Sequence, residues 1–355
     1  MKKRLKGNFI INILGLLLVA CITVLAAVQI GYKDLMKNQD LSQEAGHIKE
    51  FRYHCAFIAQ SYEDPFWDSI YEGARNAGEV QGIYVENYGE KLSLNYSLDQ
   101  RIEMAIAASV DAIIVEGDDQ VSTTELIDEA IDQGIVVVTV YQDQVQSRRR
   151  TFVGSNKFNM GYNLCSKAYQ CLEDDSDEIM VLFDASLDQN SENTILNSGM
   201  QKYLEEHSSE AVVNAQLIDS SETYNTEEQI RQLLRNVSKR PKVIVCTNLI
   251  QTECAYQTVV DLNCVGEVKI LGFYYSKAIL EGIDKGVIEA TMTVDTRQMG
   301  IEAVDSINEY LGVGYVSDYI PVKSHIVDKE EARKLLEEMR EEEEPDEMMQ
   351  GRARP

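Results

Sequence analysis

Patterns that usually carry catalysis or metal binding are missing from the sequence. No Cys-x-x-Cys pair occurs, and the four histidines (His47, His54, His207 and His325) are scattered along the chain. No phosphate loop of the form GxGxxG or GxxxxGKS is present, and no serine lies in a nucleophile-elbow motif. The sequence therefore gives no support for a zinc site, a nucleotide site or a hydrolase. We predict that the protein is not an enzyme and needs no metal or cofactor.

Positive charge is also scarce. The chain has 33 Lys and Arg against 59 Asp and Glu, which gives a formal net charge of −26 at pH 7. Because the amino-terminal segment is itself cationic, the excess negative charge belongs to the body and the carboxyl tail. A surface of that sign repels nucleic acid and anionic lipid, so we expect no nucleic-acid partner.

Residues 9–30 form an almost unbroken apolar run, long enough to cross the ~30 Å hydrocarbon core of a membrane. Lys2, Lys3, Arg4 and Lys6 precede it. By the positive-inside rule these cations stay in the cytoplasm and everything after the run lies outside. We therefore predict a cytoplasmic stub and transmembrane signal anchor over residues 1–31, a linker over residues 32–50, and an extracytoplasmic body held at the cell membrane.

A lipoprotein signal is a second interpretation of the same run. Leu18, Val19, Ala20 and Cys21 resemble a lipobox, in which the cysteine would be lipidated. Residues 22–30 stay apolar, however, whereas a lipoprotein usually turns polar directly after its cysteine. The uncleaved anchor is the favoured interpretation, and both interpretations tether the body to the outer face of a membrane.

From residue 53 onward, short β-branched runs alternate with helical patterns. Near-continuous Val and Ile runs, such as residues 135–140, are typical of parallel strands buried on both faces. The pattern predicts strands over residues 53–59, 83–88, 112–115, 135–141, 179–183, 212–217, 243–247 and 268–273. The fold class is therefore α/β, with doubly wound parallel sheets.

The body is long for a single doubly wound sheet, so two lobes are expected. Residues 51–155 together with about 295–315 would form the first lobe, and residues 156–294 the second. Residues 316–328 would be a final crossover strand. A ligand is expected in the cleft between the lobes, because several crossovers make a hinge there.

Residues 329–355, which include four consecutive glutamates, are predicted to be an acidic tail that begins as a frayed helix and ends disordered. Cys55 and Cys246 lie inside apolar runs and are expected in the core. The spacing of Cys254 and Cys264 is compatible with a disulfide across a helix-to-strand turn, but spacing alone leaves that pairing open.

Residues 53–67 are the most informative segment for a binding site. An apolar strand runs into a turn that presents Asp64 beside Phe66 and Trp67. Pro65 suits the first position of the following helix, and Asp64 can cap its free amides. Open parallel sheets bind ligands at the carboxyl ends of their strands. The turn therefore forms either one wall of a pocket or, in the simpler interpretation, two core aromatics and a helix cap.

Most of the further candidates end or follow other predicted strands, at the same edge of each sheet, and Asp295 lies where the chain is expected to cross back to the first lobe. For the acidic ones a solvated loop carboxylate is an equally good interpretation, because acidic residues are common in this chain. These candidates are Glu116, Tyr141, Asp143, Asp184, Tyr274 and Asp295.

Several segments together resemble the ribose/galactose group of type I periplasmic sugar-binding proteins. The resemblance extends over residues 51–327 and rests on five pieces that occur in the family's order and spacing. These pieces are residues 64–67, 100–115, 152–156, 271–273, and 290–292 followed by 298–300. The resemblance implies a two-lobed receptor that closes on a sugar and hands it to an ABC importer.

The resemblance also implies where the ligand would be held. The family's polar residue and stacking aromatics after the first strand fall on Asp64, Phe66 and Trp67. Its Asn at a strand end of the second lobe falls on Asn248, and its Ser/Thr-Asp pair falls on Ser155 and Asn156.

The sequence departs from the ribose-type pattern where that pattern has charged clamps. Tyr141 and Gln142 stand in place of an Asp-Arg pair, and Tyr274 stands in place of an Asp. The hinge Gln is replaced by Val294, with Asp295 beside it, and the expected Arg of the second lobe has no counterpart. Because Asp and Arg fix sugar hydroxyls through charge-assisted bonds, we expect a ligand that is larger than ribose, more stacked, or different in kind.

The function that follows is an extracytoplasmic receptor for a sugar or sugar-like molecule, with an ABC permease as its partner. The alternative is a ligand-sensing subunit for a membrane histidine kinase. An uncleaved anchor favours that alternative, because a captured receptor need not diffuse. An enzyme of the same fold class is a third and weaker option.

Overall fold

Residues 51–59, 64–88, 96–174, 177–185, 191–207, 209–220 and 222–350 are described by the computed structural model of the chain, with side chains described up to residue 340. Among these residues, no helix combines the length and apolarity that a membrane span requires. The predicted anchor over residues 1–31, the lipidation candidate Cys21 and the linker over residues 32–50 lie outside the described part of the chain.

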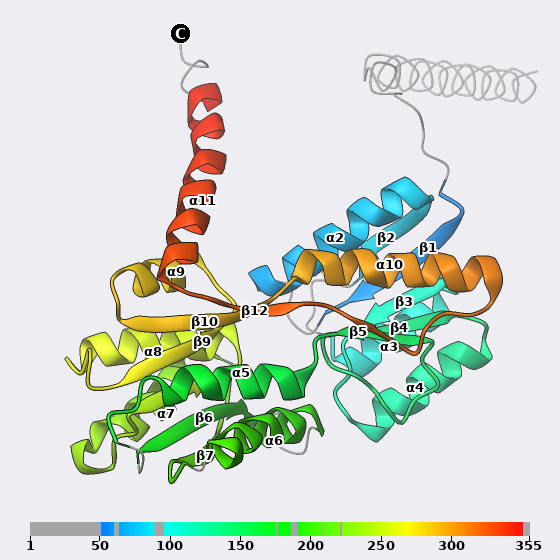
Figure 1. Ribbon diagram of the computed structural model, residues 1–355. Coiled ribbons are helices and arrows are strands. Elements are labelled where there is room, and N and C mark those ends of the chain that lie inside the picture. Colours follow the sequence, from blue (N-terminus) through cyan, green and yellow to red (C-terminus); the bar gives the residue numbers. More distant parts are fainter. Residues whose placement is uncertain are drawn as a thin grey trace, which may run out of the picture. The chain divides into compact units, whose positions relative to one another are not determined.

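The first lobe is built on a six-stranded sheet whose strands all run parallel, in the order β11-β5-β4-β3-β1-β2 (Figure 1). Its strands are β1 (Tyr53–Ile58), β2 (Ile83–Asn87), β3 (Ala112–Val115), β4 (Val136–Val140), β5 (Thr151–Gly154) and β11 (Tyr319–Pro321). Its helices are α2 (Pro65–Gln81), α3 (Leu98–Ala107), α4 (Val121–Asp132) and α10 (Thr296–Val313).

Alternate side chains of the central strands serve the two faces of this sheet. Cys55 and Phe57 of β1 pack with apolar residues of α2 and α10, whereas Ala56 and Ile58 pack with α3 and α4. Every residue of β4 is buried, as the unbroken Val run predicts for a strand covered on both sides.

The second lobe has the same layout on a six-stranded sheet of order β12-β10-β9-β8-β6-β7 (Figure 1). Its strands are β6 (Glu178–Asp184), β7 (Val212–Ile218), β8 (Val243–Cys246), β9 (Lys269–Phe273), β10 (Ile288–Val294) and β12 (Ser324–Val327). Its helices are α5 (Lys157–Tyr169), α6 (Ser191–Glu206), α7 (Thr223–Arg235), the short 3-10 helix η2 (Val237–Lys239), α8 (Leu249–Asp261) and α9 (Lys277–Asp284). The predicted class of two α/β lobes with parallel sheets is confirmed, with β12 as an antiparallel strand at one edge.

The chain passes between the sheets after β5, after β10, and between β11 and β12. Where a single crossover strand is expected over residues 316–328, the structure has two short strands, one in each sheet. Backbone bonds tie the crossing segments together: Val322 N donates to Gly154 O at 2.9 Å, and Asp295 N donates to Lys323 O at 3.0 Å. These segments form the hinge between the lobes.

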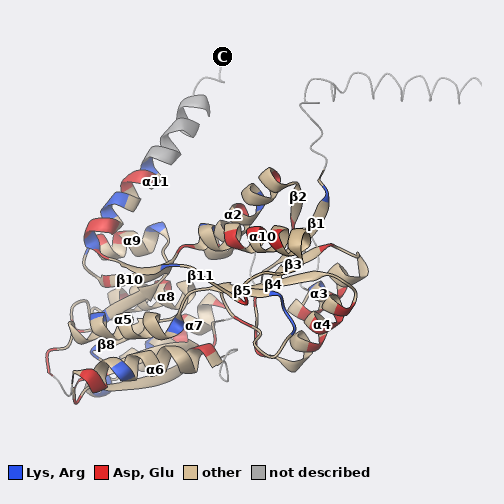
Figure 2. Cartoon of the chain, turned by 45° about the vertical axis from the view of Figure 1, so that its right-hand side comes forward, with Lys and Arg blue, Asp and Glu red and all other residues tan. Residues whose placement is uncertain are grey.

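The carboxyl-terminal segment begins as a helix, as the sequence predicts, and the first turns of this helix pack on the body. Residues 329–350 form helix α11 (Lys329–Gln350), and its first turns pack on α9. Ala332 and Leu336 are buried there, and Arg333 Nε donates to Asp284 Oδ1 at 2.6 Å. Beyond them α11 extends away from α9 (Figure 1). Figure 2 shows acidic residues over α4, α10 and α11, in keeping with the negative net charge.

The cysteines of the described residues are free thiols, so Cys254 and Cys264 do not form the disulfide that their spacing left open. Both are buried, and burial raises the pKa of the Cys254 thiol to about 11. Cys55 and Cys246 lie in the core as expected.

Helices α2 and α10 approach each other closely through glycines. A Cβ added at Gly300 would lie 2.0 Å from Ile70 O, and one at Gly73 would lie 2.2 Å from Arg297 O. Backbone atoms cannot yield to a side chain as a flexible side chain can. The two glycines therefore fix the position of α2, whose first residues face the other lobe.

Gly300→Ala is expected to destabilise the protein by about 1–3 kcal/mol, the usual cost of overpacking a filled contact. Gly312→Ala, on the exposed end of the same helix, is the control, because a Cβ there meets nothing within 4 Å. It should leave stability unchanged or raise it by up to ~1 kcal/mol through better helix propensity. Urea unfolding measures both, and equal midpoints for Gly300→Ala and the wild type would contradict the close contact.

Candidate ligand-binding site

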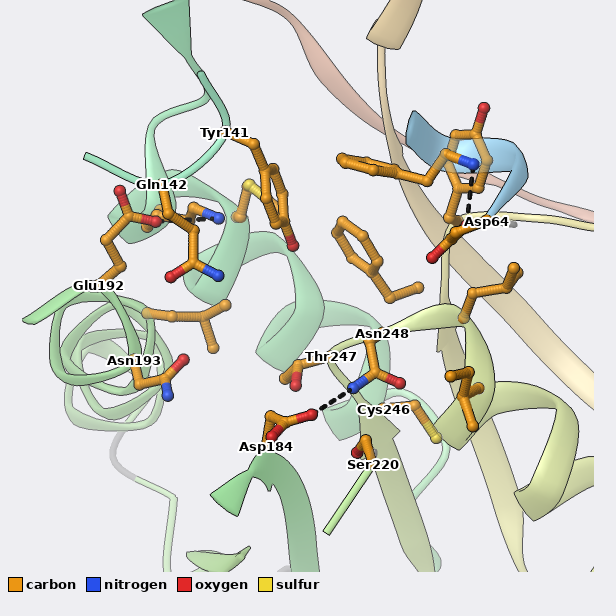
Figure 3. Close-up of a pocket in the computed structure, with 18 of the residues that line it drawn as sticks. Asp64, Tyr141, Gln142, Asp184, Glu192, Asn193, Ser220, Cys246, Thr247 and Asn248 are labelled. Atoms are coloured by element: carbon orange, nitrogen blue, oxygen red, sulfur yellow. Dashed lines mark hydrogen bonds and ion pairs between the residues drawn. The ribbon is translucent and has the colours of Figure 1, made fainter. Parts of the chain in front are cut away.

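A cavity of about 190 Å³ lies between the lobes, at the carboxyl ends of strands from both sheets. Figure 3 shows its labelled side chains around a central space: Tyr141, Gln142 and Glu192 on one side, Asp64 across from them, and Asp184 and Asn248 below. Eight of the residues singled out as candidates line it, namely Asp64, Phe66, Trp67, Glu116, Tyr141, Asp184, Asn248 and Tyr274.

The amino end of α2 supplies one wall. Asp64 is the N-cap, its Oδ1 accepts from Phe66 N at 2.9 Å, and Pro65 holds the first helical position. This geometry places Phe66 and Trp67 in the first turn, where both side chains line the cavity. Burial, followed by repulsion from Asp68 and Glu253, raises the pKa of Asp64. The turn thus acts both as a helix cap and as a wall of the cavity.

Aromatic rings from both lobes meet at Phe66. Its ring centroid lies 4.6 Å from that of Tyr141 in the first lobe. It lies 5.0 Å from Tyr274 and 6.0 Å from Phe273, which both belong to the second lobe. Trp67 contacts Tyr141 edge-on at 6.2 Å and is only 6% exposed. The rings form one continuous apolar wall across the two lobes.

Two of these rings are held by unusual backbone conformations. Tyr141 has φ 65° and Tyr274 has φ 59°, both in the left-handed region that bulky residues rarely adopt. Tyr141 follows β4 and Tyr274 follows β9, which are the third strands from the β11 and β12 edges of their sheets. The same turn therefore places a tyrosine ring at the same point of each lobe. Strain of this kind concentrates at ligand clamps and active sites.

Charged side chains occupy another wall. Lys157 Nζ lies 3.1 Å from Glu192 Oε2 and 3.8 Å from the centre of the Tyr141 ring. Burial alone would lower the pKa of Lys157, but the charge of Glu192 offsets this and the pKa is raised. Burial raises the pKa of Tyr141 to about 12.

The first lobe adds a buried carboxyl to the same wall. Glu116 is 3% exposed and accepts a bond from Gln142 Nε2 at 3.1 Å. Burial raises its pKa well above the ordinary range, although the nearby Lys157 acts in the opposite direction. Glu116 is therefore more readily neutral than an exposed glutamate.

The floor of the cavity is polar and belongs to the second lobe. Asp184 ends β6, and its Oδ2 lies 3.5 Å from Asn248 Nδ2. Thr247 and Ser220 follow β8 and β7 and line the same region. Amides, hydroxyls and a carboxylate at one point provide both donors and acceptors for a hydroxylated ligand.

Direct bonds link the lobes beside the cavity. Asp143 N donates to Glu192 Oε1 at 3.0 Å. Ser191 N and Oγ donate to Asp119 Oδ2 at 2.8 and 3.0 Å. The amino end of α6 is thereby attached to two loops of the first lobe.

Four of the expected contacts lie away from the cavity lining. Asp143 faces Arg149, because that guanidinium and two local donors hold its carboxylate. Ser155 Oγ donates to Val322 O in the hinge. Asn156 and Asp295 are N-caps of α5 and α10, with their side-chain oxygens taken by Asn159 N and Gln298 N. In each case a nearby backbone or charged partner holds the side chain in place.

Some lining residues were not among the candidates drawn from the sequence. Lys157 and Glu192 come from the first turns of α5 and α6, which a search of strand ends does not reach. Phe273 ends β9 directly before Tyr274 and has the appearance of an ordinary strand residue in the sequence. Asn156, which caps α5 directly before Lys157, is the feature from which a helix start at this edge could have been predicted.

Asp143→Asn is expected to lower stability but leave the cavity intact. Asp143 and Arg149 are 10% and 8% exposed as side chains and lie 2.6 Å apart between Oδ2 and Nη2. Breaking a buried pair of this kind typically costs about 3–5 kcal/mol. Asp132→Asn, which removes an exposed partner of Arg148, is the control and should change little. Thermal unfolding compares them, and equal melting temperatures for the two variants would argue against the buried pair.

Comparison with known proteins identifies the family of the chain and solved structures of similar fold. A family model described as a periplasmic binding protein domain matches residues 55–314. No curated protein sequence is significantly similar to the chain.

Solved structures with a similar fold share low sequence identity. GanP, a glucose-galactose binding protein from Geobacillus stearothermophilus, has 19% identity and a TM-score of 0.69, over 78% of this chain and 98% of GanP. The XylFII-LytSN complex has 22% identity and a TM-score of 0.66, over 79% and 98%. An ABC transporter solute-binding protein from Burkholderia graminis C4D1M, solved with D-arabinose, has 20% identity and a TM-score of 0.68, over 79% and 96%. At these identities the likeness establishes the fold alone.

Proposed function

The chain belongs to the family of periplasmic binding protein domains, and on that premise we propose that it is an extracytoplasmic receptor. It binds a single sugar or sugar-like molecule between its lobes and delivers it to an ABC importer. The observation that carries the proposal is the cavity at the strand ends of both sheets, with an aromatic wall on one side and a polar floor on the other.

The chemistry of the lining suits a sugar. A pyranose has apolar C–H faces, which pack on rings such as Trp67 and Phe66, and an edge of hydroxyls. Asp184, Asn248 and Thr247 supply acceptors and donors for such an edge. Two proteins of similar fold are described as binding sugars, one glucose and galactose and the other D-arabinose, which is consistent with this assignment.

The size of the cavity favours a small ligand. At about 190 Å³ it is below the ~300–1,000 Å³ typical of pockets for drug-sized molecules. One monosaccharide unit is therefore a better fit than an oligosaccharide. A thermal-shift screen of the full chain against monosaccharides and polyols identifies the ligand, because a compound that binds only the folded state raises the melting temperature.

Binding and lobe closure are one equilibrium in this proposal. A ligand in the cavity contacts both lobes only when they are closed, so it shifts the population toward the closed state by its differential affinity. A micromolar affinity corresponds to about 8 kcal/mol. Ring stacking plus several hydrogen bonds supply that amount without an Asp-Arg clamp.

Trp67→Ala is expected to weaken binding of the sugar found in the screen at least tenfold, because it removes one aromatic wall. Tyr71→Ala is the matched control: Tyr71 lies one turn further along α2 and packs on Phe57, and it does not line the cavity. The affinity of the Tyr71→Ala variant for the same sugar, measured by calorimetry, should stay within twofold of that of the wild type. An unchanged affinity in Trp67→Ala would show that the Trp67 ring is not part of the binding site.

Sensing for a membrane histidine kinase is the second candidate function. The apolar run over residues 9–30 favours it, since a receptor fixed in the membrane can contact a fixed partner. One solved structure of similar fold is a complex named XylFII-LytSN, which supports a role in which the domain binds another protein.

Deletion of the gene separates the two functions. Under the transport proposal, uptake of the radiolabelled sugar falls at least tenfold, and permease and ATPase genes lie beside the gene. Under the sensing alternative, uptake persists, while the transcriptional response to the sugar is lost and kinase and regulator genes are the neighbours. Normal uptake in the deletion strain would refute the transport proposal.

A further inference from the structure

The cavity has an unequal balance of charges. Asp64 and Glu116 line it from the first lobe, and Asp184 and Glu192 line it from the second. Lys157 is the one cationic side chain among the described lining residues, which include no Arg or His. Carboxylates accept hydrogen bonds from the hydroxyls of a neutral sugar, but four of them beside one ammonium also leave negative charge that a cationic ligand would balance.

Closing the lobes concentrates these carboxylates. Glu116 and Glu192 are 3% and 9% exposed, so water contributes little to screening them. Carboxylates brought together in a poorly solvated space repel one another or take up protons. Burial raises the pKa of Glu116, Glu192 and Asp64 alike. A cation inside the cavity would relieve this cost only in the closed state.

The side-chain ammonium of Lys157 already lies beside a buried carboxylate of the cavity. Lys157 Nζ lies 3.1 Å from the Glu192 carboxylate and 3.8 Å from the centre of the Tyr141 ring. An aromatic face together with a carboxylate is a favourable site for a cation. On the other side of the cavity, Asp64 lines the same wall as the rings of Phe66 and Trp67, so a carboxylate and aromatic rings are both present there.

We propose, on the premise of the function above, that the ligand is an amino sugar. Its protonated amino group lies among the cavity carboxylates, and Asp64 on the aromatic wall and Asp184 on the floor balance its charge. Its ring packs on the aromatic wall, and its hydroxyls bond to the floor around Asn248. The ligand acts as the counter-ion that makes closure favourable.

Calorimetry on the full chain tests the charge of the ligand with matched compounds. The probes are glucosamine, galactosamine and mannosamine, each compared with its parent hexose and its N-acetyl form. These sets differ at one substituent, which is an ammonium, a hydroxyl or a neutral amide. The expected result is that one amino sugar binds at least tenfold more tightly than both of its neutral counterparts.

Isosteric variants identify the carboxylates that produce the preference for the amino sugar. Asp64→Asn keeps a good N-cap residue and removes only the charge, and Asp184→Asn does the same at the floor. Each is expected to reduce the preference for the amino sugar from tenfold to below threefold. Glu125→Gln, on the exposed surface of α4, is the control and should keep the full preference. Melting temperatures without ligand verify that each variant is folded.

The outcomes separate this inference from the function on which it rests. If a neutral hexose binds as tightly as its amino form, the receptor function stands and the amino-sugar assignment is wrong. If neither the amino sugars nor any compound of the wider sugar screen binds, both are wrong. A tenfold preference that survives in both aspartate variants would also overturn the assignment.

Discussion

The meeting of aromatic rings at Phe66 is the interaction on which the rest of the site depends. The ring contacts Tyr141 of its own lobe and Phe273 and Tyr274 of the other, so its position decides how the two lobes meet. That position is set in steps from the sequence. Asp64 and Pro65 fix the first turn of α2, and the glycine contact at Gly300 fixes the helix against α10. Because α10 begins at the hinge, the same helix pair connects the cavity wall to the segment about which the lobes turn.

A second link joins the hinge to the rings. Thr296, the first residue of α10, donates from Oγ1 to Ser69 Oγ at 2.7 Å, and its Oγ1 lies 3.2 Å from the Tyr274 hydroxyl. Tyr274 is held in its left-handed conformation by a bond from its own N–H to Met292 O at 2.7 Å. A strained backbone of this kind costs about 1–3 kcal/mol and persists only where neighbouring structure fixes it. The bond to Met292 lies within the second lobe, whereas the contacts of the Tyr274 side chain with Thr296 and Phe66 cross to the first lobe.

The sequence predicted the fold better than the direction of individual side chains. Apolar runs such as residues 135–140 depend on burial along a whole strand, so they identify strands with little ambiguity. The cap at Asp64 was equally clear, because the Pro that follows leaves few other conformations. The residue after a strand is different, since its side chain turns toward the nearest strong partner. Asp143 faces Arg149 for that reason, and Asp295 caps α10. Both partners lie close in the sequence, but the pattern of residues does not show which local partner the side chain takes.

The charged residues of the cavity that the sequence did not identify are the ion pair of Lys157 and Glu192. Lys157 and Glu192 are 35 positions apart (192 − 157) on two helices, and their pairing with the Tyr141 ring joins both lobes. In the ribose-type pattern that this sequence resembles, an Asp and an Arg stand near the position of Tyr141, and such a pair balances its own charge. With a phenol there instead, one ammonium of the chain lies among the cavity carboxylates, and under the amino-sugar proposal the ligand supplies the second. The free energy of lobe closure then depends on the charge of the ligand. A group that neutralises the closed cavity stabilises the closed state and leaves the open, solvated state almost unchanged.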